Sequence, residues 1–149
     1  MLIKHLDKLN PDRKLRKILI PLCGKTLDMK WLAEQGLVTV GVEGVQQALD
    51  EFFSEAGLDK SETSITGLGS YGKLFQSKDG MIKLYCGDML QFSSSFEGTF
   101  DAIWDRGSLV ALDRSDVPRY AQILKDLLNV GGRLLVEVMG YDLDSMSGQ

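Results

Sequence analysis

The sequence predicts a doubly wound, mostly parallel α/β sheet. Short apolar runs bounded by charge alternate along the chain with segments whose apolar residues recur every three or four positions. Strands that alternate with helices in this way form a parallel sheet with helices on both faces. The 149 residues, 44% of them hydrophobic and 26% charged, suffice for one domain with a buried core. We therefore expect a single domain over 1–149, with a short helix over 1–10 ahead of a core over 15–142.

The first half of that core reads as two strands and two helices. The pattern predicts a strand in "RKILIPLC", a helix in "LDMKWLAEQG" that ends at Gly36, and a strand in "VTVGVEG". The next helix is the clearest, because its apolar residues keep helical spacing and Gly57 follows them. Its apolar positions are Val45, Ala48, Leu49, Phe52, Phe53 and Ala56.

The second half begins with a segment, 58–72, that is rich in Gly, Ser and Thr and predicts a surface loop. "KLFQSKDGMIKLYCGD" predicts a hairpin that turns at Asp79-Gly80. "FDAIWD" predicts the next strand. "SDVPRYAQILKDLLNVGG" predicts a helix with Ser115 as N-cap and the closing Gly-Gly pair as its end, followed by a strand in "RLLVEVMGYD".

Composition argues against several classes of partner. The net charge is −4 and no run of Lys or Arg occurs, which disfavours nucleic acid and anionic membrane. Two cysteines without a CxxC pair and a single histidine exclude a four-ligand Cys/His zinc site within one chain. The cysteine usage suits a reducing compartment, and "MLIKHLDKLN" is too charged for a signal peptide. We expect a cytoplasmic protein.

The turn after the first strand, in "ILIPLCGKTLDMKW", ends in Gly24-Lys25-Thr26 like a phosphate-binding loop. That loop needs a further glycine five positions before Gly24, and this position is Leu19. A nucleotide hydrolase is therefore a remote alternative. The G-x-G-x-x-G motif of nicotinamide-dependent proteins is also absent from this turn.

Acidic residues close two of the predicted strands. Glu43 lies 19 residues beyond Gly24, which is the spacing at which a carboxylate accepts from both ribose hydroxyls of a bound nucleoside. Asp88 ends the next main strand, where it can accept from an adenine amino group while Met89 packs on the ring. The alternatives are a solvated strand end for Glu43 and a turn-initiating residue for Asp88. S-adenosylmethionine fits such a site, since it has no phosphates to cradle.

The fourth main strand ends in Asp105-Arg106-Gly107, beside the space that a ligand would occupy. For Asp105 we favour a structural brace, paired with Arg106 or nearby backbone. For Arg106 we favour a functional role.

Four stretches together resemble the thiopurine S-methyltransferase family: "PLCGKTLDMKWLAEQG", "VGVE", "LYCGDM" and "IWDRGSLVAL". The resemblance runs almost without gaps from Lys4 to Asp142. It implies the Rossmann-like S-adenosylmethionine methyltransferase fold, with a cofactor-binding core over 15–142. The implied reaction moves a methyl group from S-adenosylmethionine to the sulfur of an aromatic or heterocyclic thiol, in an enzyme that is a monomer when full length.

The resemblance also implies site residues. Leu22 and Gly24 of the PLCGK turn contact the cofactor, Glu43 holds the ribose, and Asp88 with Met89 flanks the adenine. Vertebrate members of the family carry Ser-Ile at this last pair, and the Asp of this sequence keeps a hydrogen-bond acceptor there. Arg106 of the WDRG motif lies near both cofactor and substrate, where it can favour the thiolate. No residue is implied as a general acid or base.

The sequence departs from the family at both ends. Members carry a segment before "HLDKLN" that covers the cofactor, and they continue beyond "GYDLDSMSGQ" with further strands. We therefore expect a sheet that lacks its last strands, an exposed edge at "RLLVEVMG", and a tendency to aggregate with little turnover. The alternative to an active methyltransferase is a truncated non-catalytic remnant that only binds cofactor weakly.

Overall fold

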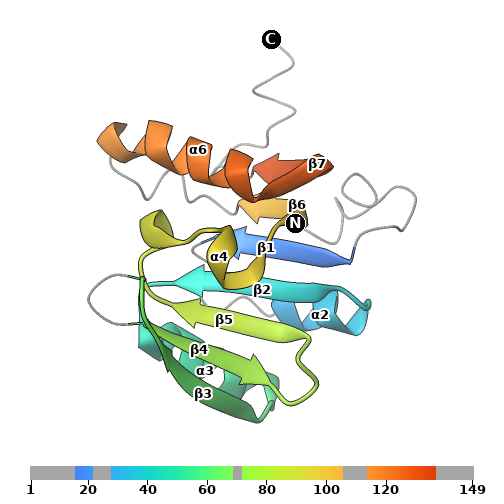
Figure 1. Ribbon diagram of the computed structural model, residues 1–149. Helices are drawn as coiled ribbons and strands as arrows, with labels where there is room; N and C mark the ends of the chain where they lie inside the picture. The colour runs from blue at the N-terminus through green and yellow to red at the C-terminus, as the bar shows by residue number, and fades with distance from the viewer. Residues whose placement is uncertain (1–15, 22–27, 69–71, 106–113, 137–149) are drawn as a thin grey trace.

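The computed structural model describes residues 16–21, 28–68, 72–105 and 114–136 (Figure 1). The strands are β1 (Lys17–Pro21), β2 (Val38–Glu43), β3 (Lys60–Ile65), β4 (Gly72–Ser77), β5 (Ile82–Cys86), β6 (Phe100–Asp105) and β7 (Leu128–Val136). The helices are α2 (Asp28–Glu34), α3 (Gln46–Ala56), α4 (Ser94–Glu97) and α6 (Val117–Leu127), with 3-10 turns η1 (Met89–Gln91) and η2 (Arg114–Asp116). The predicted helix over 1–10 lies outside the described residues.

Within the described residues, one sheet of seven strands has the order β3-β4-β5-β2-β1-β6-β7. β5, β2, β1, β6 and β7 pair in parallel, whereas β3 and β4 pair antiparallel at one edge. β1 lies between β2 and β6, so the strand order reverses direction there. A crevice at such a reversal is where doubly wound sheets bind their ligands. The predicted fold class is confirmed.

Helices cover both faces of the sheet, with α2 and α3 on one side and α4 and α6 on the other (Figure 1). Residues of one strand alternate between the two cores: Ile18 and Ile20 pack with Phe52 of α3, and Leu19 packs with Leu124 of α6. Each fully buried aliphatic or aromatic side chain contributes about 1.5–3 kcal/mol relative to an exposed one. Burial on both faces explains the uninterrupted apolar run in β1.

Three chain segments are joined at the amino end of the sheet by Asp101 of β6. Its Oδ2 accepts from the backbone N–H groups of Arg16 at 3.0 Å and Lys17 at 3.1 Å. Its Oδ1 accepts from the side-chain amide of Asn129 at 2.8 Å. These bonds tie β1, β6 and β7 together in the register that the ladder requires.

The hairpin prediction is confirmed: β4 and β5 are antiparallel, and Gly80 takes a positive φ of 73° in the turn between them. The prediction of a loop over 58–72 is wrong, because β3 pairs with β4 from Lys60 to Ile65. β3 is an edge strand with the sequence KSETSI, and its four central residues are exposed. Such a strand has no apolar alternation to reveal it.

The predicted limits of the helix before β7 are also wrong. The helix begins at Val117 and its N-cap is Asp116 rather than Ser115; both Asp116 and Ser115 lie in η2, and the N-cap side chain makes no capping hydrogen bond. The helix ends at Leu127, and the Gly-Gly pair lies inside β7, where Gly131 has a φ of 79°. The pairing of β6 with β7 shifts register at this point. The glycines therefore belong to an irregularity in the strand and do not end the helix.

Candidate functional site

The predicted site residues that the structure describes lie at the carboxyl ends of adjacent parallel strands. Pro21 of β1 pairs with Val42, and Glu43 pairs with Cys86 of β5. The ends of β1, β2 and β5 are therefore side by side, as the strand-end prediction requires. Leu22, Gly24 and Arg106 lie outside the described residues.

Glu43 is half-buried at the last position of β2. Its Oε2 accepts from the backbone N–H of Val45 at 3.0 Å, which orients the carboxylate at the strand end. Its own carbonyl accepts from the N–H of Gly87 at 3.0 Å. The backbone of Glu43 is therefore held by a hydrogen bond to the residue that follows the end of β5. A carboxylate held in this way can accept from two adjacent hydroxyl groups of a ligand.

Leu68, at the end of the segment that follows β3, lies directly against this edge. A Cβ placed on Gly87 would come within 2.5 Å of Leu68 Cβ and 2.8 Å of the Leu68 carbonyl oxygen. That carbonyl accepts from the N–H of Asp88 at 3.0 Å. Only glycine permits so close an approach. Leu68 was not among the predicted site residues, although a glycine directly after a strand is a sign of a close backbone contact.

Asp88 is exposed and begins η1, and its Oδ1 accepts from the backbone N–H of Leu90 at 2.9 Å. It therefore has the turn-initiating role that was the alternative at this position. This hydrogen bond uses only part of the accepting capacity of the carboxylate, whose two oxygens have about four acceptor sites. Met89 is 2% exposed and packs in the core with Tyr85 and Phe92. This packing holds η1 onto the sheet just below Asp88.

Asp105 is fully buried at the end of β6. Its Oδ2 accepts from the hydroxyl of Tyr120 in α6 at 2.8 Å. The interpretation of Asp105 as a structural brace is supported, with Tyr120 as a partner that was not anticipated. The brace fastens α6 to the strand that leads into the WDRG segment.

An apolar cavity of about 330 Å³ lies between α6 and the strands β6 and β7. Its lining residues are Ile103, Tyr120, Ala121, Leu124, Lys125, Leu128 and Leu134. Glu43, Asp88 and Met89 are not among them, so this cavity is separate from the strand-end site. Among the described residues, no group of three or more His, Cys, Asp and Glu is arranged to hold a metal ion.

Comparison with known proteins identifies the family. The thiopurine S-methyltransferase (TPMT) family model matches residues 1–149. The chain belongs to the thiopurine S-methyltransferase family. Among curated relatives, the thiopurine S-methyltransferase of Oryctolagus cuniculus is 41% identical over 148 residues, which cover 99% of this chain and 60% of the relative. The probable thiopurine S-methyltransferase of Danio rerio is 38% identical, with 99% and 63% covered. The chain thus spans about 60% of the length of these members of the family.

Solved structures agree with this family in fold. A SAM-bound amino pentose methyltransferase, CalS10 from Micromonospora echinaspora, superposes with a TM-score of 0.63 at 19% identity, covering 92% of this chain and 48% of that one. A TehB-like SAM-dependent methyltransferase from Corynebacterium glutamicum gives a TM-score of 0.61 at 17% identity, with 95% and 67% covered. At such identities the likeness concerns the fold, which is the Rossmann-like methyltransferase fold that the resemblance implied.

Proposed function

We propose that the carboxyl edge of this sheet binds S-adenosylmethionine, and that the protein transfers its methyl group to the sulfur of an aromatic or heterocyclic thiol. The observation that carries the proposal is the pairing of Glu43 with the Gly87-Asp88 turn at adjacent strand ends. This geometry offers two carboxylates, one per strand, to a ligand that lies across the edge. The names of the TPMT relatives support the same reaction.

In this proposal the nucleoside lies across the ends of β2 and β5. Glu43 accepts from the two ribose hydroxyls with its oriented carboxylate. Asp88 accepts from the adenine amino group at an acceptor site that is not used by the Leu90 N–H. Met89, packed in the core, holds η1 in place beneath the ring. S-adenosylmethionine suits this arrangement better than ATP, because two carboxylates repel a triphosphate.

The remaining assignments rest on the family motifs. Leu22 and Gly24, in the turn that follows β1, hold the amino-acid end of the cofactor. Arg106, directly after β6, lies near the sulfonium and the substrate sulfur. A guanidinium there lowers the pKa of a bound thiol and so favours the thiolate nucleophile.

The chemistry requires few catalytic groups. Attack of a thiolate on the sulfonium methyl is a direct displacement: the sulfur–carbon bond to the substrate forms as that to the cofactor breaks. S-adenosylhomocysteine leaves as a neutral thioether, so no acid is needed. The main contributions of the protein are alignment of the two sulfurs and exclusion of water. A non-catalytic remnant that binds cofactor weakly is the competing proposal, and turnover distinguishes the two.

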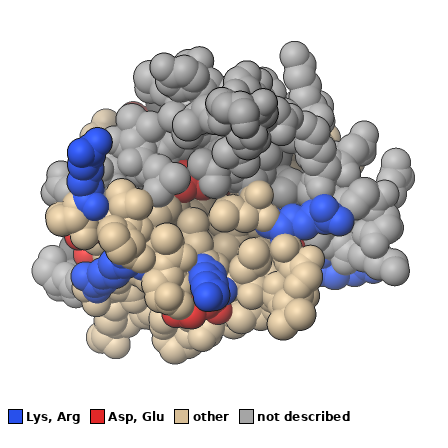
Figure 2. Space-filling view, turned by 90° about the horizontal axis from the view of Figure 1, so that it is seen from above, with Lys and Arg blue, Asp and Glu red and all other residues tan. Residues whose placement is uncertain are grey.

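We also propose that the protein acts on small molecules as a cytoplasmic monomer, without nucleic acid or membrane partners. On the face seen in Figure 2, the Lys and Arg side chains of the described residues stand singly rather than in one patch. The net charge of −4 points the same way. No helix in the described part of the chain is long and apolar enough to cross a membrane.

Titration calorimetry with S-adenosylhomocysteine, ATP and NAD tests the binding proposal. We expect S-adenosylhomocysteine to bind most tightly, and tighter binding of ATP contradicts the proposal. Methylation of 6-mercaptopurine, followed by mass spectrometry, then separates an enzyme from a remnant. Binding without methylation favours the remnant.

A further inference from the structure

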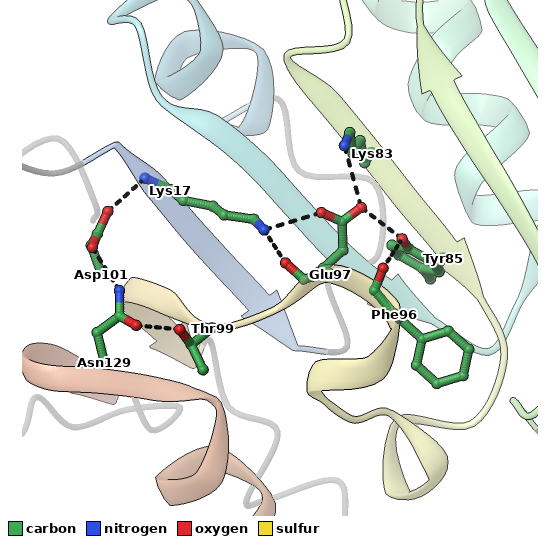
Figure 3. Close-up of polar contacts among 8 residues, drawn as sticks. All are labelled: Lys17, Lys83, Tyr85, Phe96, Glu97, Thr99, Asp101 and Asn129. Atoms are coloured by element: carbon green, nitrogen blue, oxygen red, sulfur yellow. Dashed lines mark hydrogen bonds and ion pairs between the residues drawn. The ribbon is translucent and has the colours of Figure 1, made fainter.

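A buried carboxylate outside the proposed site joins three side chains on one face of the sheet. Glu97, the last residue of α4, has a side chain that is 7% exposed. Its Oε2 lies 3.2 Å from Lys17 Nζ, and its Oε1 lies 3.4 Å from Lys83 Nζ. The hydroxyl of Tyr85 donates to the same Oε1 at 2.6 Å (Figure 3). We call Glu97, Lys17, Lys83 and Tyr85 the Glu97 cluster.

The Glu97 cluster supplies the cations and the hydrogen bond that a buried carboxylate requires. A carboxylate taken out of water costs several kcal/mol unless cations and hydrogen bonds compensate it. Here two ammonium groups and a phenol surround it, and Lys17 also donates to the carbonyl of Glu97. Burial, together with the hydrogen bond and the negative charge of Glu97, raises the pKa of Tyr85 far above its ordinary value. The phenol therefore remains a donor at any physiological pH.

The position of the Glu97 cluster along the chain links it to the proposed adenine subsite. Tyr85 and Lys83 are on β5, which leads directly into Gly87 and Asp88. The side chain of Glu97 reaches back to β5. Its hydrogen bond to Tyr85 therefore closes a loop whose two ends are 12 residues apart in sequence. Asp88 and Met89 lie inside this loop. Lys17 attaches the loop to β1, the strand at which the sheet order reverses.

Aromatic contacts fill the loop between its two fixed ends. The rings of Phe92 and Phe96 stack with centroids 5.5 Å apart, and Tyr85 meets both edge-on at 5.3 Å and 6.0 Å. The loop is therefore a packed unit that contains η1. This unit connects Glu97 to Asp88 without requiring any contact between their two side chains.

We propose that Glu97 is a positioning residue for the adenine subsite: it closes the loop that carries Asp88 and Met89 and so fixes their place beside Glu43. This inference rests on the proposed function, because it assumes that Asp88 accepts from the adenine amino group. A supporting residue of this kind matters because a displacement of about 1 Å is enough to weaken an oriented contact severely.

The test measures discrimination at the adenine amino group rather than affinity alone. Calorimetry gives the Kd of S-adenosylhomocysteine and of S-inosylhomocysteine, in which an oxygen replaces that amino group. For the wild-type chain we expect roughly 10- to 100-fold tighter binding of the adenosyl compound, the scale of a hydrogen bond to a charged group. In Glu97→Gln, which keeps the size but removes the charge, we expect this ratio to fall roughly tenfold.

Two further variants separate positioning from loss of stability. Tyr85→Phe removes only the hydroxyl that donates to Glu97 and should lower the ratio in the same direction. Ser77→Ala is the matched control, because it removes a buried hydroxyl that accepts from the N–H of Ile82 at 3.1 Å, at the far end of β5. It should lower the free energy of unfolding in urea and leave the ratio unchanged.

Each outcome bears on one statement. If the wild-type chain does not bind S-adenosylhomocysteine, the proposed function is wrong. If it binds with a high ratio that Glu97→Gln and Tyr85→Phe preserve, the function stands and the positioning role is overturned. An equal fall of the ratio in Ser77→Ala overturns it as well, because general destabilisation then explains the effect.

Discussion

The hydroxyl of Tyr120 donates a hydrogen bond across 2.8 Å to the carboxylate of Asp105, and both side chains are fully buried. The bond joins α6 to the end of β6, the strand that precedes Arg106. A buried carboxylate depends on such donors, because the low dielectric around it makes each missing partner costly.

Replacement of that hydroxyl tests the brace. We expect Tyr120→Phe to lower the free energy of unfolding by about 1–3 kcal/mol, since Asp105 then loses a buried donor. Urea denaturation followed by circular dichroism measures the change. The exposed Gln122, which pairs with Asp126 on the same helix, provides the control, and Gln122→Ala should change stability by less than about 0.5 kcal/mol. Equal effects of the two substitutions would contradict the brace.

A second prediction concerns the ribose contact. Glu43→Ala should weaken binding of S-adenosylhomocysteine by roughly 2–3 kcal/mol, the scale of hydrogen bonds to a charged group, and should leave folding nearly intact. Calorimetry on the variant measures the loss. Glu62→Ala removes an exposed acid of β3 and serves as the control that binds normally. Normal binding by Glu43→Ala means that the ribose lies elsewhere.

A third prediction concerns the close contact between Gly87 and Leu68. Gly87→Ala places a methyl group 2.5 Å from Leu68 Cβ, so backbone must shift at the base of Asp88. We expect a loss of about 1–3 kcal/mol in the free energy of unfolding. At Gly44, the matching position after β2, an added Cβ meets nothing closer than a carbonyl oxygen at 3.8 Å, so Gly44→Ala should be the milder change. If Gly44→Ala lowers the free energy of unfolding more than Gly87→Ala does, the close contact is refuted.

The pH dependence of stability gives a fourth prediction. The pKa of Asp79 lies below its ordinary value of 3.8, because its carboxylate accepts from the N–H of Met81 and the hydroxyl of Ser77. A carboxyl group whose pKa is lower in the folded than in the unfolded state stabilises the fold at pH values above its unfolded-state pKa. This contribution is lost as the pH falls through the folded-state pKa. Wild-type stability should therefore fall more steeply than that of Asp79→Asn as the pH drops below about 4.

Urea unfolding at several acidic pH values measures this difference in slope. The effect is small, since Asp79 is exposed and water screens it. Asp59→Asn, which removes an exposed carboxylate 3.6 Å from Lys78, is the control and should follow the wild-type slope. Identical slopes for Asp79→Asn and wild type would show that the turn contributes nothing through ionisation.

The sequence predicted those parts of the fold that local patterns encode. The strands β1, β2 and β6 are apolar runs, and Asp79-Gly80 has the chemistry of a tight turn, so each was recognisable by itself. β3 was missed because KSETSI is polar, and only its pairing with β4 makes it a strand. The Gly-Gly pair after α6 was misread because its role depends on the register between β6 and β7.

The same distinction holds for the site. Spacing placed Glu43 and Asp88 at strand ends, since strand ends are local features. The contacts that support them join residues from different elements, such as Leu68 with Gly87 or Tyr120 with Asp105. Hydrophobic periodicity showed Tyr120 to be buried but carried no information about the partner of its hydroxyl.

The central place of β1 in the sheet has a consequence for synthesis on the ribosome. Lys17 of β1 and Asp101 of β6 bond to one another but are 84 residues apart in sequence. At about 5–20 residues per second, roughly 4–17 s separate the emergence of the two. β2 follows β1 closely, so one side of β1 is paired early while its other side waits for β6. We expect the nascent chain to present an unpaired apolar strand edge during this interval, which makes it a client for chaperones until β6 arrives.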